Sequence, residues 1–183
     1  MRLFGSYFDT DPQYPWAAEI LAGPGPQLQR AQLLYRMTLD YRQQVAGCDD
    51  IHTRGALRNI WFFSQQSPLS LPTEHLMPAM LQIVGRLYPE KAAYVGDDGL
   101  EALIREGAAE AGRQGFGADR GVVLVVLLML TLGHGCCDDP LFPWIARTLT
   151  DQTIADAGTR ARRLETMALS SLDQVLLHLE QVG

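Results

Sequence analysis

The feature that most constrains the fold of this chain is a segment that occurs twice, 128 residues apart. Residues 11–21, DPQYPWAAEIL, align with residues 139–149, DPLFPWIARTL, so that both copies read D-P-x-aromatic-P-W-x-A-x-x-L. The match extends upstream to Gly5 and Gly133, and it uses two of the three tryptophans. A repeat of this kind predicts a structural duplication, with duplicated segments near residues 5–46 and 133–181.

Both copies contain the residue types of a helix start. An aspartate can cap the N-terminus of a helix, and a proline is tolerated in the first turn because its missing N–H would have no helical partner there. A tryptophan adds a large apolar anchor. These residues are Asp11, Pro12, Pro15 and Trp16 in the first copy and Asp139, Pro140, Pro143 and Trp144 in the second. Each copy is therefore expected to begin a helix.

Apolar residues recur at intervals of three and four over most of the chain, which is typical of amphipathic helices. The spacing predicts long helices over residues 28–46 and around 164–179, and further helices near 53–66, 74–87, 98–113 and 119–132. Residues 89–96 and 67–72 contain helix breakers and are expected to be connections. The sequence predicts an all-α, single-domain bundle of about eight helices over residues 1–183.

Composition excludes several classes of function. The net charge of −6 argues against a binder of nucleic-acid phosphates, which needs a basic surface. The N-terminus lacks the apolar stretch of a signal peptide, and the most apolar run, residues 122–132, is about half the ~20 residues of a membrane-spanning helix. Three cysteines, two of them adjacent, make a poor disulfide framework. We expect a cytoplasmic protein without nucleic-acid or membrane partners.

The glycine-rich turn before the second motif contains His134, Cys136 and Cys137. If this turn is catalytic, Cys136 or Cys137 is the nucleophile and His134 the base. Adjacent cysteines lack the spacing of a zinc site, and the first copy has Ser6 and Phe8 in place of His134 and Cys136. The sequence has no phosphate-binding loop, dinucleotide fingerprint or zinc-peptidase motif. A structural turn is favoured, and no catalytic residue, metal ligand or cofactor is predicted.

Residues 90–119 are strongly acidic. They contain seven acids against Lys91, Arg105 and Arg113, and 7 − 3 gives −4 of the total −6. A solvated helix face with Glu101 and Arg105 as an i,i+4 pair explains part of this pattern. The alternative is a surface that docks a basic partner, because complementary charge increases association rate and specificity. The predicted contact residues are Glu90, Asp97, Asp98, Glu101, Glu106 and Glu110, with an exposed Phe116 as anchor.

The segment from Gly133 to Trp144, G-H-G-x-x-x-D-P-L-F-P-W, resembles small helical bacterial proteins associated with type VI secretion effectors, among them immunity proteins. The resemblance rests on that segment, its N-terminal copy and the helical pattern. It implies a non-enzymatic protein that binds and neutralises a cognate toxin. An acidic protein suits a basic toxin such as a nuclease, whose substrate-binding surface is positive.

Three alternatives remain open. A secretion adaptor or chaperone would bind an effector without neutralising it. A small cysteine-dependent hydrolase would use His134 with Cys136 or Cys137. A helical regulator would bind a small ligand between its helices, as many bundles do. In that third case an anionic pocket would be lined by arginines, namely Arg30, Arg36, Arg42, Arg54 and Arg58. The sequence leaves the oligomeric state undetermined.

Overall fold

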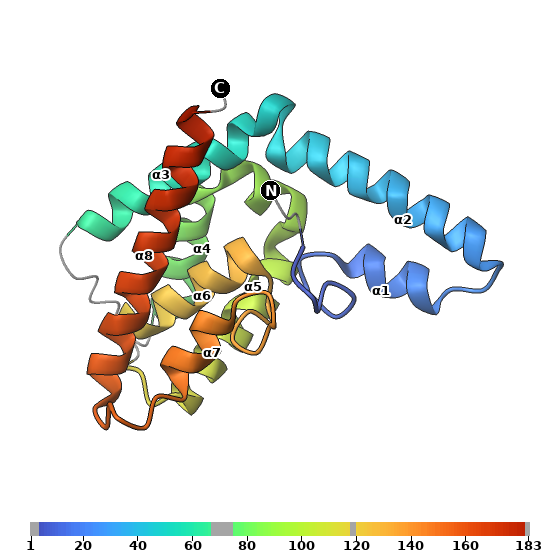
Figure 1. Cartoon of the computed structure of the whole chain (residues 1–183). Coiled ribbons are helices and arrows are strands. Elements are labelled where there is room, and N and C mark those ends of the chain that lie inside the picture. Colours follow the sequence, from blue (N-terminus) through green and yellow to red (C-terminus); the bar gives the residue numbers. More distant parts are fainter. Residues whose placement is uncertain (1–3, 67–74, 118–119, 182–183) are drawn as a thin grey trace.

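Figure 1 shows the computed structural model of the chain, which describes residues 4–66, 75–117 and 120–181. These residues form helices and no strands, so the prediction of an all-α fold of about eight helices is confirmed. The predicted connection at 67–72 and the acidic residue Asp119 lie outside the described residues. The helices are α1 (Pro15–Ala22), α2 (Gln27–Tyr41), α3 (Ile51–Gln65), α4 (Leu76–Leu87), α5 (Pro89–Arg113), α6 (Arg120–Leu132), α7 (Pro143–Leu149) and α8 (Ala157–Gln181).

Helix α6 is the centre of the main hydrophobic core. Its sequence is apolar around the whole helix, which is the pattern of a helix that is covered on several sides. Val125, Val126 and Leu130 are fully buried. Helices α5 and α8 both pack against α6, and α4 packs on α5. A Cβ on Gly107 of α5 would come within 2.5 Å of the Val126 side chain, so the absence of a side chain there lets α5 and α6 approach closely.

The connection predicted at residues 89–96 is wrong, because α5 begins at Pro89. A proline in the first turn removes no helical hydrogen bond, and Lys91 is buried there. Of the two breakers, Pro89 and Gly96, only Gly96 interrupts the helix, because its φ of 75° and ψ of 168° bend it. The prediction of a helix over 98–113 thus identified only the second part of α5.

The two copies of the repeated motif lie against each other. The carboxylate of Asp139 accepts a hydrogen bond from the backbone N–H of Ser6, with an N–O distance of 2.7 Å. The carboxylate of Asp11 accepts one from the backbone N–H of His134 at 2.9 Å. Since Ser6 and His134 occupy equivalent positions 128 residues apart, each aspartate binds the glycine turn of the other copy. This exchange is the pattern of a local two-fold arrangement.

The aspartates do not cap the helices that follow them, so this part of the motif prediction is wrong. The residues before α1 and α7 are Tyr14 and Phe142, and neither helix has a side-chain cap. Asp11 instead accepts the backbone N–H of Gln13, as Asp139 accepts that of Leu141. These bonds form because a short carboxylate reaches the N–H two residues on and shapes a turn. Both helices do begin at the predicted prolines.

The long helix after each motif is anchored in the same way but covered differently. Arg30 donates hydrogen bonds to the carbonyl oxygens of Gly23 and Gly25, and Arg160 donates to those of Ile154 and Ala155. Helix α8 lies against α3, α6 and α7. Helices α1 and α2 instead form an arm that extends from the rest of the molecule (Figure 1), and Tyr41 is the one buried residue of α2.

Candidate functional site

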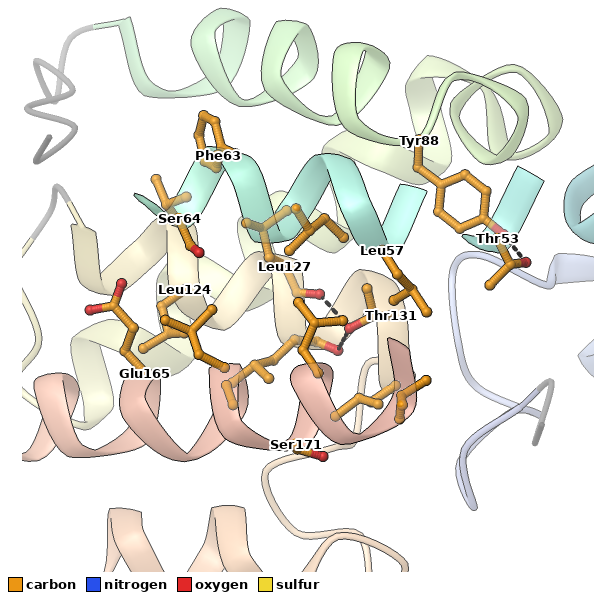
Figure 2. Close-up of a pocket in the computed structure, with 18 of the residues that line it drawn as sticks. Thr53, Leu57, Phe63, Ser64, Tyr88, Leu124, Leu127, Thr131, Glu165 and Ser171 are labelled. Atoms are coloured by element: carbon orange, nitrogen blue, oxygen red, sulfur yellow. Dashed lines mark hydrogen bonds between the residues drawn. The ribbon is translucent and has the colours of Figure 1, made fainter. Parts of the chain in front are cut away.

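An elongated cavity of about 440 Å³ lies between α3, α6 and α8, within the range of ligand pockets (~300–1,000 Å³). Its walls are largely apolar. Figure 2 shows side chains from all three helices around this space, among them Leu57 of α3 and Leu124 and Leu127 of α6. Residues from Arg120 to Leu132 line it, so it follows the whole of α6, roughly 18 Å at 1.5 Å per residue.

Two kinds of side chain keep this space open and apolar. Two residues of α8 that line the cavity, Ala168 and Ser171, are small and leave more room at their positions than leucines would. The polar Thr131 does not present a free hydroxyl to the cavity, because its Oγ1 donates to the carbonyl oxygen of Leu127 at 2.8 Å. Thr131 therefore offers little to a polar ligand, and the leucines that line the cavity along α6 are suited to apolar groups.

One end of the cavity contains Lys91, which is 3% exposed. It is the only lysine of the 183 residues, the other 14 cations being arginines. Its Nζ donates to the carbonyl oxygen of Leu130 and to the hydroxyl of Tyr14, the latter at 3.3 Å. The Nζ also lies 5.6 and 6.0 Å from the ring centroids of Tyr14 and Tyr88. Neutral groups thus surround this cation.

The electrostatics of this end follow from burial. Burial lowers the pKa of Lys91 to about 8, against the opposing effect of Asp11, because an ammonium loses hydration in an apolar site. Burial likewise raises the pKa of Tyr14 and of Tyr88, which therefore stay neutral phenols. The Tyr88 hydroxyl is held by Thr53 at 2.8 Å, as Figure 2 shows. The ammonium lacks a carboxylate in direct contact among the described interactions.

At the opposite end of the cavity, the positive charge of Arg120 is already neutralised by Glu165. Arg120 Nε donates to both carboxylate oxygens of Glu165 at 3.0 and 2.9 Å, and its Nη2 donates to one of them. This pairing raises the pKa of Arg120. A bidentate arginine–carboxylate pair satisfies both partners, so this end has less need of a charged ligand than the Lys91 end.

The predicted acidic contact residues do not form one surface. Asp97 and Asp98 are exposed, Glu101 pairs with Arg105, and Glu106 contacts His134 Nδ1 at 2.9 Å. Glu90 lies in the first part of α5, before the bend, where it contacts His52 Nδ1 at 3.2 Å. Glu101 is half-buried and Glu106 is exposed. The second part of α5 therefore keeps four accessible carboxylates.

Two of the predicted contact residues are buried. Glu110 is 7% exposed, and its carboxylate accepts hydrogen bonds from Arg113 and Gln114. Phe116 is 6% exposed, so the expectation of an exposed aromatic anchor is wrong. The reason is the chain reversal at Gly115, whose φ of 70° turns the ring back onto the main core. A phenylalanine beside glycines had suggested an exposed loop.

The thiols and the imidazole of the second glycine turn are not brought together as a catalytic pair. Cys136 and Cys137 are buried, whereas His134 contacts Thr10 and Glu106. A hydrogen bond with Cys137 and burial raise the pKa of the Cys136 thiol, the opposite of what a nucleophilic thiolate requires. Within residues 4–66, 75–117 and 120–181, no group of three or more metal-ligating side chains could hold a metal ion.

The five arginines suggested for an anionic pocket do not line this cavity. Arg58 lies instead beside Trp61 in a separate hollow between α3 and α8. Sequence reasoning missed Lys91, which it counted as one charge of the acidic stretch 90–119 and placed in an expected connection at 89–96. Two features of the sequence could have identified it. Every other cationic side chain is an arginine, and tyrosines, Tyr88 and Tyr94, lie three residues away on either side of this one lysine.

Comparison of the chain with family models, with curated proteins and with solved structures found no match. No helix of the described part of the chain is long and apolar enough to span a membrane.

Proposed function

We propose that this protein is a non-enzymatic binding protein that docks a basic protein through the exposed side of α5, and that the partner is a cognate toxin. The observation that supports the proposal is the division of α5 after Gly96. Leu100, Leu103 and Ile104 are buried on one side of the helix. This part of the helix also carries four accessible carboxylates, those of Asp97, Asp98, Glu101 and Glu106, of which Glu101 pairs with Arg105 and Glu106 with His134.

Such a surface is suited to rapid recognition of a positive partner. Exposed carboxylates retain their hydration, so the folded protein does not bear the cost of burying them. Their field attracts an opposite charge over about one Debye length, ~8 Å at physiological salt, and mainly increases the association rate. Binding through this surface should therefore weaken as salt rises.

The identity of the partner as a toxin rests on the resemblance to immunity proteins. An immunity protein acts by covering a functional surface of the toxin, and a stable complex of this kind buries about 1,200 Å² or more. A nuclease is a suitable target because its nucleic-acid surface is positive. An effector chaperone would use the same acidic surface, but its partner would stay active in the complex.

The test compares two variants with the same change in charge. The first reverses Asp97, Asp98 and Glu101 to lysine, and the control reverses the exposed acids Glu19, Asp40 and Asp173. Immobilised wild-type protein is used to capture a partner from the producing organism, and the purified partner is then titrated into each protein by calorimetry. We expect the first variant to bind at least about tenfold more weakly and the control to bind normally.

Equal weakening by both triple variants would show that only net charge matters and would contradict the α5 surface. A partner whose toxic activity falls when the wild-type protein binds supports the immunity function. Undiminished activity in the saturated complex would replace that function with an adaptor or chaperone role. The buried thiols and the raised pKa of Cys136 give no support to the hydrolase alternative.

A further inference from the structure

We propose that the cavity between α3, α6 and α8 binds one medium-chain fatty acid, with its carboxylate against the ammonium of Lys91 and its alkyl chain along α6. This site is separate from the acidic surface of α5, and it would be a second binding function of the protein.

The shape of the cavity favours a linear ligand. Its lining residues on α6 recur every three or four positions, including Val123, Leu124, Leu127 and Leu128, which places them on one side of the helix. Across the cavity, Leu169 and Leu172 of α8 provide a second apolar wall. A compact ligand would fill part of this length, whereas an extended alkyl chain can contact both walls throughout.

The charge of the cavity decides between an acid and a neutral amphiphile. The Lys91 ammonium has three N–H donors, and its described hydrogen bonds, to Leu130 and Tyr14, use two. Both of these acceptors are uncharged. A buried cation is stabilised most by an anion in contact with it, and a carboxylate at this end would supply that anion and accept the third N–H.

The remaining charges direct the carboxylate to this end of the cavity. Arg120 at the other end already holds Glu165 in a bidentate pair. Asp11 is close enough to affect the pKa of Lys91, but its oxygens accept hydrogen bonds from Gln13 and His134. Lys91 is therefore the cation of the cavity that has room for a new anionic partner.

The first experiment titrates dodecanoate and dodecan-1-ol, below their aggregation concentrations, into the full-length protein, with stoichiometry read by native mass spectrometry. We expect one dodecanoate per chain and at least about tenfold weaker binding of the alcohol, because the alcohol oxygen can accept a hydrogen bond from the ammonium but carries no negative charge. Affinity should rise about fourfold per methylene from octanoate to dodecanoate if the chain is buried. Equal affinities of acid and alcohol, or no saturable binding, would overturn the proposal.

Two variants locate the site. Lys91→Met should remove the preference for the acid while retaining the alcohol, and a retained preference would exclude Lys91 as the anion partner. Leu172→Trp fills the cavity and should abolish binding of both ligands. Leu177→Trp is the matched control, since Leu177 is exposed on the same helix and does not line this cavity. Equal binding by the two tryptophan variants would place the ligand elsewhere.

A measurement on the unaltered protein remains decisive if Lys91→Met fails to fold. Because Lys91 is the only lysine, labelling with ¹⁵N-lysine gives a single side-chain ammonium signal. Dodecanoate should shift this signal and dodecan-1-ol should leave it nearly in place, whereas no shift at saturation would contradict the assigned contact. The charge-reversed α5 variant should bind dodecanoate normally, so that failure of the toxin-binding proposal does not affect this one.

Discussion

The Lys91 ammonium lies among tyrosines in the folded protein and in water in the unfolded chain. Burial lowers its pKa from 10.5 to about 8, so between these pH values the unfolded chain binds a proton that the folded protein has lost. Stability therefore rises with pH across this window. The destabilising effect of the charge is fully present below about pH 8 and is gone above 10.5.

We predict that the free energy of unfolding increases from pH 7 to pH 9.5, with Lys91 contributing up to about 2 kcal/mol. Urea titrations of the wild type and Lys91→Met at both pH values measure this contribution. Other titrating groups, such as the Cys136 thiol, are present in both proteins and cancel in the difference. The same pH dependence in both proteins would show that Lys91 is not the group responsible.

The pH range of this comparison must end below 10, because above that pH the buried tyrosines lower the stability of the folded protein. Burial raises the pKa of Tyr14, Tyr41 and Tyr88, so the folded protein keeps phenolic protons that the unfolded chain loses. Stability consequently falls as pH increases above the ordinary tyrosine pKa of about 10. Above that pH the titration of the tyrosines thus offsets the stability gained from Lys91.

At the scale of single elements, the bend in α5 depends on one backbone conformation. Gly96 has φ 75° and ψ 168°, a region that is essentially restricted to glycine. A Cβ at this position would meet nothing within 4 Å, so any cost of adding one comes from the backbone. Gly85 in α4 also has free space around it, but it lies inside a regular helix.

The same substitution should therefore have opposite effects at these two glycines. We predict that Gly96→Ala destabilises the protein by ~1–3 kcal/mol through backbone strain, and that Gly85→Ala stabilises it by ~0.5–1 kcal/mol through higher helix propensity. Thermal and urea unfolding of both variants provide the comparison. If Gly96→Ala were as stable as Gly85→Ala, the bend would not require a positive φ.

Helix positions could largely be predicted because the apolar spacing along this chain reflects burial directly. The run through residues 122–132 predicted α6, and the repeated prolines predicted where α1 and α7 begin. Residues 89–95 were missed because Pro89 and Gly96 are breakers by type, although the first starts a helix and the second only bends it. Local composition does not distinguish these roles, because tertiary contacts decide between them.

The candidate site was much less predictable than the helices. The cavity exists because α3, α6 and α8, which are distant in sequence, do not pack closely along their whole lengths. No periodicity within one helix contains that information. The position of Lys91 also depends on the arrangement of Tyr14 and Leu130, which are 77 and 39 residues away. The sequence therefore predicted that α5 is acidic, but it did not predict that Lys91 is buried within this helix.

At the scale of the whole molecule, the two copies of the repeat share their local contacts and differ in their surroundings. The reciprocal bonds of Asp11 and Asp139 join the copies at their centre. From there α8 runs across the core, where Leu164 is fully buried. The equivalent helix α2 leaves large apolar side chains exposed, including Leu28 and Tyr35. Equivalent sequence positions thus have unequal burial.

This difference predicts unequal local stability. Amides of residues 30–38 in α2 should exchange with solvent through openings of lower free energy than amides of residues 160–168 in α8, because little apolar surface must separate when α2 unfolds. Hydrogen exchange followed by mass spectrometry at micromolar concentration compares these matched segments directly. Equal protection in dilute solution would mean that the arm is held as firmly as the core. Protection of α2 that increases with protein concentration would show instead that a second copy covers its apolar side.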